Sequence, residues 1–395
     1  MKHYFQWSAA FGAYFAILGL WTSFGPSTMM AVNPQAAPVA LACITLAYFV
    51  ATPLAHRIWR WLGFSRALRC MASGVLVLLM AAAWQPAWLV WCMPLALIFG
   101  SGTYTLCETR LLEDLAQRGQ GHAFGRARKW GSLGFLLAAT AGGAAFSVGG
   151  VTRSFTGALA VGAGVYWLCC LGLSRSLASV SEAEHAMPAP DSQRSDDAVA
   201  QGPMPVASTR GARFGGCAAI AGMRVAEAAA TTWFGAYWLH TGHSPLETGV
   251  LCAVPVAAEF LAMWKGGPWM RRTSAAAMML ICCGVSVVRW VGTPFCETLW
   301  CAVPLQGIHA FTFGFFYPAS LVWLKHTFGD AFFHTRYLTE SVARAATAAV
   351  TFVAAGWAIA TLGYIAIYAT CLVLTVFSGL WWLRAVKAVP GRQRT

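Results

Sequence analysis

The sequence predicts an all-α membrane protein with twelve transmembrane helices in two six-helix halves and both chain termini in the cytoplasm. Three observations lead to this fold class. Of the 395 residues, 58% are hydrophobic and only 10% are charged, whereas a soluble domain carries roughly 25% charged residues. The apolar residues gather in stretches about as long as a bilayer-spanning helix. The basic residues gather in alternate connections between those stretches.

Twelve stretches qualify as transmembrane helices, because a helix needs about 20 predominantly apolar residues to cross the hydrocarbon core. None shows the period-2 alternation of a membrane-spanning strand. The first stretch follows a single lysine and lacks a small-residue cleavage site, so we expect it to be retained. In chain order the predicted spans are 8–30, 38–55, 67–84, 87–107, 130–149, 155–174, 214–239, 246–264, 275–293, 298–322, 337–360 and 362–383.

The lysines and arginines orient these helices, because both residue types resist translocation. With the N-terminus inside, and with Arg69 at the start of the third span counted with the connection before it, all but four of the 27 basic residues fall at the termini or in connections on one side. Arg153 alone lies on the other side, and the other three fall within spans. We therefore expect a multi-pass protein of the cell inner membrane with cytoplasmic termini. The net charge of +13 follows from this bias and requires no nucleic-acid partner.

The longest polar segment divides the spans six and six. It contains "SVSEAEHAMPAPDSQRSDDAVAQGPMPVAST", and its Ser, Ala, Pro and acidic residues are typical of a flexible linker. The sequence thus predicts an N-terminal half at 1–174, a cytoplasmic linker at 175–213 and a C-terminal half at 214–395.

Other functional classes find no support in the sequence. The 13 cysteines are scattered through apolar stretches without metal-site spacing, so we expect small core residues. The chain has no P-loop and no sizeable soluble domain for an ATP-driven pump, and no nucleophile–base constellation. We expect no enzymatic activity, no metal and no cofactor.

A set of ionisable residues inside predicted spans points to function instead. Each costs a few kcal/mol or more at the bilayer centre unless it is paired or hydrated. Such residues by default line a water-filled cavity and act there. The set consists of Arg224, Glu227, Glu259, Arg289, His309 and Arg344.

Simpler interpretations exist for several of these residues. Arg289 is about one turn from the predicted outer end of its span and could extend to the lipid headgroups. His309 could be a core histidine bonded to a backbone carbonyl. Glu340 and Arg344 are four residues apart and could satisfy each other on one helix face.

Four sequence stretches carry a specific resemblance. They are "FGRARKWGSLGF" at 124–135, "VAAEFLAMW" around Glu259, "SVVRWVG" around Arg289 and "QGIHAFTFGFFYPA" around His309. The first resembles the start of the fifth helix in the lactose permease (oligosaccharide/proton symporter) family, and all four resemble the phenylpropionate permease-like group. Both belong to the major facilitator superfamily, whose two six-helix halves and cytoplasmic linker match the predicted arrangement.

In the N-terminal half, the resemblance implies a substrate-binding set. Glu108 and Arg128 match a carboxylate–guanidinium pair that binds sugar in the lactose permease. Phe135 falls where that permease stacks an aromatic ring against the sugar.

In the C-terminal half, the resemblance implies a coupling set and a charge pair. Glu259, Arg289 and His309 match an acid, an arginine and a histidine that couple proton movement to substrate. Glu227 and Arg344 match an interhelical acid–base pair, with Glu and Arg here in place of Asp and Lys.

One departure from the lactose permease bears on proton transport. Thr312 stands where that permease has the glutamate that carries the transported proton. Threonine does not titrate near neutral pH, so Glu259, helped by His309, is the expected proton carrier. The departure also favours the phenylpropionate-like group over lactose permeases.

The predicted function is proton-coupled symport of a small organic solute by alternating access. The expected substrate is an aromatic carboxylate such as phenylpropionate, or a sugar or glycoside. The expected partners are this solute, protons and membrane lipid, and the protein is expected to be a monomer. The alternatives are a proton-driven exporter of drugs or metabolites and, from a different class, a non-transporting membrane sensor.

Overall fold

The computed structural model describes residues 2–117, 124–181 and 210–387, and every regular element within these ranges is a helix. The chain forms two compact units. The first comprises Met1–Ala198 and Trp238–Ala253, and the second comprises Val199–Tyr237 and Val254–Thr395.

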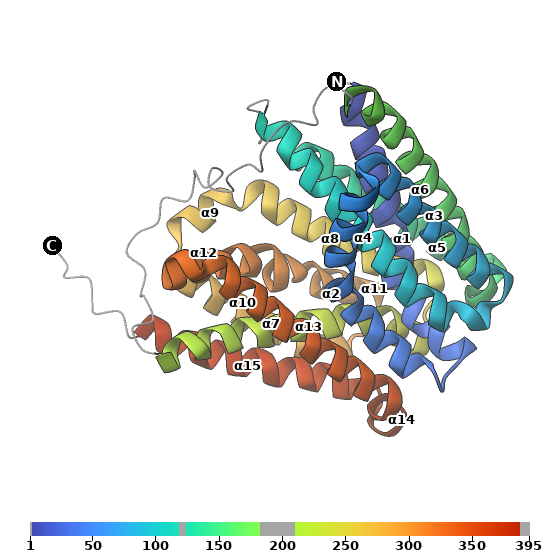
Figure 1. The fold of residues 1–395 in the computed structure, drawn as a ribbon. Helices are drawn as coiled ribbons and strands as arrows, with labels where there is room; N and C mark the ends of the chain where they lie inside the picture. The colour runs from blue at the N-terminus through green and yellow to red at the C-terminus, as the bar shows by residue number, and fades with distance from the viewer. Residues whose placement is uncertain (1, 118–123, 182–209, 388–395) are drawn as a thin grey trace. The chain divides into compact units, whose positions relative to one another are not determined.

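The first unit is built from long helices that pack along their lengths, with α1 against α5 and α6, α2 against α4, and α3 against α4 and α6 (Figure 1). Its helices are α1 (Lys2–Val32), α2 (Ala37–Leu62), α3 (Phe64–Trp84), α4 (Leu89–Gln117), α5 (Phe124–Gly149) and α6 (Val151–Ser181).

Glycines allow α1 and α5 to approach closely, as small residues commonly do at helix contacts in membranes. A Cβ atom at Gly134 would overlap the backbone of Gly12, and one at Gly19 would overlap the backbone of Phe135. The α1–α5 contact therefore fixes the backbone of α5 over the turns that carry Arg128 and Phe135.

The second unit contains several interrupted helices. The segment predicted as the tenth span consists of α11 (Leu299–Gly307), a π-helical turn (Ala310–Phe315) and α12 (Phe316–Phe328), and a second π-helical turn (Ala354–Ala358) follows α13. The remaining helices of this region are α7 (Arg210–His240), α8 (Pro245–Lys265), α9 (Gly267–Arg272), α10 (Ala275–Gly292), α13 (Phe332–Val353), α14 (Ile359–Leu362) and α15 (Ile365–Lys387).

The core of the second unit joins α7, α10, α12 and α15. Trp323 and Trp382 are almost fully buried, and their ring centroids lie 5.2 Å apart in an edge-to-face arrangement. Met279 of α10 and Met223 of α7 belong to the same apolar cluster. The Ser378 hydroxyl donates a hydrogen bond to the Ala219 carbonyl at 2.7 Å and ties α15 to α7.

The predicted spans agree well with the observed helices, but the count of transmembrane helices does not reach twelve. Eleven of the described helical segments are long and apolar enough to cross a membrane. The helix α7 (Arg210–His240) covers the predicted seventh span and is not among the eleven. It carries Arg224 and Glu227 near its middle. The twelfth transmembrane helix therefore remains a prediction.

Several helices continue beyond the predicted spans on the side that the cation count assigns to the cytoplasm. Thus α2 runs to Leu62, α4 to Gln117 and α6 to Ser181, because polar residues outside the apolar stretch can still form helix. For the same reason α7 begins at Arg210, inside the predicted linker of 175–213. Residues 182–209 of that linker lie outside the described residues.

The expectation that the cysteines are small core residues is wrong for Cys43 and Cys70, which are exposed, and two others are joined in a disulfide. Cys296 and Cys301 form a disulfide that closes the connection between α10 and α11. This connection is predicted to face the outer compartment, and oxidising compartments are where disulfides persist.

Candidate functional site

The first unit brings the predicted Glu108 and Arg128 together. Arg128 Nη1 lies 3.7 Å from Glu108 Oε1, and the same oxygen accepts a hydrogen bond from the Tyr104 hydroxyl at 3.1 Å. The Arg128 side chain is 52% exposed and that of Glu108 is 28% exposed. The pair thus keeps free donor and acceptor capacity for a ligand.

Aromatic rings adjoin this pair. Tyr14 stacks on Tyr104 with ring centroids 5.1 Å apart, and its hydroxyl lies 3.0 Å from the hydroxyl of Ser101. Phe135 lies two helical turns after Arg128, on the same side of α5, but its side chain is buried. Tyr104, which the sequence did not single out, contacts the acid–base pair through its hydroxyl, and Tyr14 stacks on its ring.

The second unit gathers most of the ionisable residues predicted inside spans. Glu227 of α7 lies at their centre and is 7% exposed. Its Oε1 atom lies 3.1 Å from His309 Nδ1 and accepts a hydrogen bond of 2.7 Å from the Thr231 hydroxyl. Its Oε2 atom lies 4.0 Å from Arg224 Nη1.

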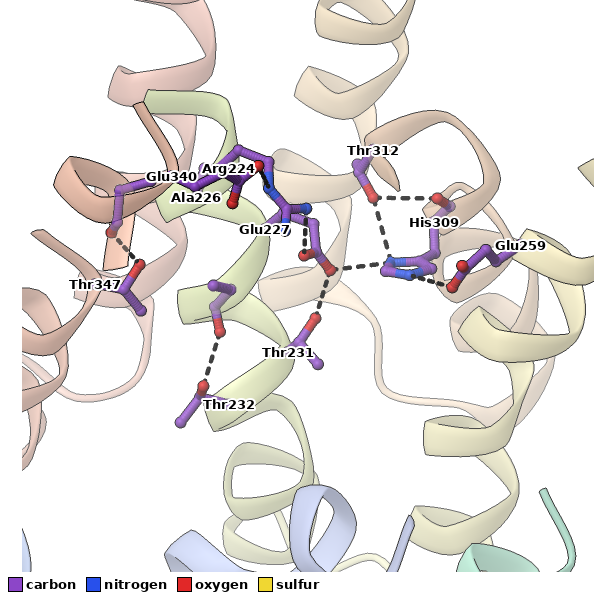
Figure 2. Close-up of polar contacts among 12 residues, drawn as sticks. Arg224, Ala226, Glu227, Thr231, Thr232, Glu259, His309, Thr312, Glu340 and Thr347 are labelled. Atoms are coloured by element: carbon purple, nitrogen blue, oxygen red, sulfur yellow. Dashed lines mark hydrogen bonds and ion pairs between the residues drawn. The ribbon is translucent and has the colours of Figure 1, made fainter. Parts of the chain in front are cut away.

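The imidazole of His309 connects two carboxylates. While Nδ1 faces Glu227, Nε2 lies 3.8 Å from Glu259 Oε2 on α8. Figure 2 shows the three side chains in a row, with the ring between the two acids. Glu259 is the more open of the two acids, with its side chain 23% exposed against 9% for Glu227.

Arg289 is buried inside the second unit and is only 2% exposed, so it does not extend to lipid headgroups. Its Nη1 donates to the Thr312 hydroxyl at 3.0 Å and lies 3.4 Å from His309 Nδ1. Its Nη2 donates to Gln306 Oε1 at 2.8 Å. The guanidinium is therefore held against the histidine by two neutral side chains.

One segment supplies three of these contacts. Gln306, His309 and Thr312 lie three residues apart along it, and all three reach Arg289. A π-helical turn, Ala310–Phe315, begins directly after His309 and contains Thr312. Such turns occur frequently at functional sites.

Arg224 is a second cation near the acids, and two of its three guanidinium nitrogens make no hydrogen bond. Its Nε lies 3.7 Å from Glu340 Oε1, yet neither Nε nor Nη1 has a hydrogen-bond partner. The guanidinium lies 4.8 Å from the ring centroid of Phe313 and 5.2 Å from that of Tyr317.

The predicted pair of Glu227 and Arg344 remains a prediction. The described polar contacts of Glu227 are with Arg224, Thr231 and His309. Arg344 lies one turn after Glu340 on α13 and is partly buried.

Sequence reasoning found the charged members of the site but not its neutral ones. Gln306 was not singled out, because an uncharged polar residue in a span gives no signal that separates it from packing residues. Arg224 was noted as a cation without a proposed partner. Its position three residues before Glu227 was the signal for their contact.

Solved transporter structures have the same fold. The nucleoside transporter NupG matches with a TM-score of 0.73 at 15% identity, over 99% of this chain and 100% of that chain. The xylose transporter XylE from E. coli matches with a TM-score of 0.68 at 12% identity, over 99% and 97% of the two chains. An auto inhibited POT family peptide transporter matches with a TM-score of 0.69 at 10% identity, over 100% and 98%.

These likenesses show that the chain has the fold of solved multi-pass membrane transporters. The sequence model of the MFS_1 like family matches residues 3–338, and the chain belongs to that family. As a member of a transporter family, it is not an enzyme. Comparison with curated protein sequences gives no significant match.

Proposed function

We propose that the protein is a proton-coupled symporter that carries a small organic solute across the cell inner membrane by alternating access. In this proposal the protein is a monomer with both termini in the cytoplasm. It needs no cofactor, and the proton gradient drives transport. Glu259, Arg289 and His309 couple the proton to the solute, and Glu108 and Arg128 bind the solute with Phe135 in a supporting position.

The observation that carries this proposal is the buried group of ionisable side chains in the second unit. The imidazole of His309 contacts two carboxylates, those of Glu227 and Glu259, and the guanidinium of Arg289. Burying such groups is costly unless they are paired or hydrated, and ionisable residues inside membrane spans are by default functional. A proton that binds one of the acids removes a buried charge and so changes the relative free energies of the transport conformations, which is what coupling requires.

The favoured substrate is an aromatic carboxylate such as phenylpropionate. Arg224 supports it, because its Nε and Nη1 atoms make no hydrogen bond, and the ring centroids of Phe313 and Tyr317 lie 4.8 and 5.2 Å from its guanidinium. A guanidinium binds a carboxylate with two parallel hydrogen bonds, and the adjacent rings suit an aromatic body.

A sugar or glycoside is the second candidate, and a different observation favours it. The Glu108–Arg128 pair with the Tyr104 hydroxyl offers a charged acceptor and charged donors at one place. Such a set suits the neighbouring hydroxyls of a sugar ring, and the stacked Tyr14 and Tyr104 suit its apolar face.

Uptake by reconstituted vesicles tests the proposal. Purified protein in vesicles would be given radiolabelled 3-phenylpropionate or lactose, with and without a pH difference that is acidic outside. We expect accumulation of one solute above its external concentration only when the pH difference is imposed. Because phenylpropionate can cross bilayers unassisted as the neutral acid, protein-free vesicles are the necessary control.

Three outcomes would count against the proposal. Uptake that never exceeds equilibration would show a uniporter. Accumulation that requires acid inside would show the exporter. Binding without any flux would show the sensor.

A further inference from the structure

We propose that Glu227, His309 and Glu259 form one shared proton site, in which His309 passes the proton between Glu259 and the buried Glu227. Glu227, which the sequence resemblance places only in a charge pair, is then the buried proton acceptor of this site. The inference rests on the proposed proton coupling and specifies which groups perform it.

The contacts of the imidazole define the path. Its two nitrogens face different carboxylates, with 3.1 Å from Nδ1 to Glu227 and 3.8 Å from Nε2 to Glu259. A structural histidine needs one partner, but a relay needs a donor on one side and an acceptor on the other. Figure 2 shows the ring in this bridging position.

The two carboxylates differ in a way that gives the path a direction. The Glu259 side chain is more than twice as exposed as that of Glu227, so Glu259 is the acid that exchanges protons with water. Glu227 already receives a hydrogen bond from Thr231 on the oxygen that faces the ring. The carboxylate of Glu227 is therefore held in place, while that of Glu259 is free to approach the His309 ring.

The proton transfer conserves bonds and charge and needs no further reactant. An ionised Glu227 only accepts hydrogen bonds, so Nδ1 carries the ring proton at the start. When protonated Glu259 comes within hydrogen-bond distance, its O–H bond breaks and an N–H bond forms at Nε2. The Nδ1–H bond breaks and an O–H bond forms on Glu227. The ring is neutral before and after and has changed tautomer, and the negative charge has moved to Glu259.

Arg289 stabilises the product of this step. After the transfer, Nδ1 has a free lone pair, and Arg289 Nη1 lies 3.4 Å from it with a proton to donate. Arginine stays charged at any physiological pH, so it contributes a fixed positive field and a donor. Gln306 and Thr312 hold the guanidinium in this position.

Further ionisable groups near the site lie on α7, α13 and α15. Arg224 of α7 faces Glu227 and is shared with Glu340 of α13. Tyr368 and Cys371 of α15 lie close enough to interact electrostatically with Arg289. Among these, only Glu340 offers a further carboxylate, and its described ion pair is with Arg224. Glu340 is thus a natural control for Glu227, since both acids pair with Arg224 and only Glu227 contacts His309.

The first test needs no substrate and uses protons as the probe. Infrared difference spectra of the purified full-length protein between acidic and alkaline pH report carboxyl groups that gain or lose a proton. The variants are Glu227→Gln, Glu259→Gln and Glu340→Gln. We expect Glu227→Gln to remove a titrating carboxyl band and to shift the midpoint of the remaining one, because coupled acids titrate as a unit. Glu340→Gln should leave the midpoint of that coupled titration unchanged.

The outcome that overturns the inference is a Glu227→Gln spectrum whose Glu259 band titrates as in the wild type, since the proton then resides on Glu259 alone. An equal midpoint shift in Glu340→Gln also overturns it, because the effect would then act through Arg224. Should Glu227→Gln fold poorly, Arg224→Gln/Glu227→Gln keeps the charge balance and is judged by the same criterion.

The second test separates this inference from the proposed function. In vesicles, Glu227→Gln should accumulate no solute above equilibration, while it still exchanges solute at equal concentrations. If the wild type accumulates solute and Glu227→Gln does so equally, proton coupling stands and the relay is refuted. If the wild type itself never responds to a pH difference, the proposed function fails, whatever the infrared spectra show.

Discussion

The two units hold charged groups of the same chemical kinds in opposite environments. In the first unit, Glu108 and Arg128 lie 3.7 Å apart, and the arginine side chain is half exposed. In the second unit, Glu227, His309 and Arg289 are each less than a tenth exposed and contact one another or shared partners. Replacing the water around an exposed charge pair with a ligand costs little free energy. Protonating a buried group changes the electrostatic free energy of the protein strongly.

This difference suggests a division of labour. Solute recognition suits a site whose donors and acceptors still face water. Proton coupling suits a site where one added proton alters the electrostatic free energy by several kcal/mol, because charges in low dielectric interact strongly. We therefore expect variants of the first unit to change affinity, and variants of the second unit to change coupling and stability.

The largest expected effect is at Glu259. An amide cannot take up or release a proton, so Glu259→Gln should abolish accumulation driven by a pH difference. Exchange of solute at equal concentrations involves no net proton release, and it should persist. Both are measured as solute flux in reconstituted vesicles. Concentrative uptake by Glu259→Gln vesicles under an imposed pH difference would show that Glu259 is not required as a proton site and would contradict the coupling role proposed for it.

The next effect is on stability, at Arg289. Arg289→Ala leaves Gln306 and Thr312 without their donor and removes the positive charge beside His309. Loss of one member of a buried charged network costs about 3–5 kcal/mol, and denaturant unfolding of the purified protein measures it. Arg272→Ala, at an exposed arginine at the end of α9, should stay within about 0.5 kcal/mol of the wild type. If both variants lost the same free energy of unfolding, Arg289 would contribute no more to stability than an arginine on the surface.

A smaller effect is expected in the first unit. Glu108→Gln removes the charge that Arg128 and Tyr104 contact. Hydrogen bonds to a charged group contribute about 1.5–3 kcal/mol, so the solute concentration for half-maximal exchange should rise roughly 10- to 100-fold. The accumulation reached at saturating solute should not change. Lys129→Ala, which alters the neighbouring exposed cation, is the matched control. A loss of accumulation in Glu108→Gln would contradict the division of labour.

Much of the fold was predictable because hydropathy and span length are local properties of the sequence. The helix α10 (Ala275–Gly292) matches its predicted span within one residue. The overhang of α6 to Ser181 was missed, since a helix outside the membrane needs no apolar stretch. The π-helical turn after His309 was also missed, because it depends on contacts with other helices and leaves no periodic signal.

The candidate site was predictable where charge made burial costly. Glu259, Arg289 and His309 stood out as ionisable residues in apolar stretches, and the structure brings His309 into contact with both of the others. The partner of each charge was not predictable, because sequence gives the helix face only within one helix. Glu227 illustrates this limit, since its contact with His309 joins two helices that are far apart in the chain.

The smallest expected effect decides which cation supports Glu227. Arg224 Nη1 lies 4.0 Å from its carboxylate, and sequence resemblance predicts Arg344. Two double-mutant cycles, Glu227→Gln with Arg224→Gln and Glu227→Gln with Arg344→Gln, isolate each interaction energy from unfolding measurements. Arg224 is partly exposed and makes no hydrogen bond to Glu227. We therefore expect an interaction energy of about 1 kcal/mol for this pair, near the low end for contacting residues. A larger value with Arg344 would restore the pair predicted from sequence and leave Arg224 free for an anionic solute. If both pairs were additive, neither cation would be a partner. His309 would then be the group that keeps Glu227 stable in the interior, and the two units would differ even more sharply than their exposures indicate.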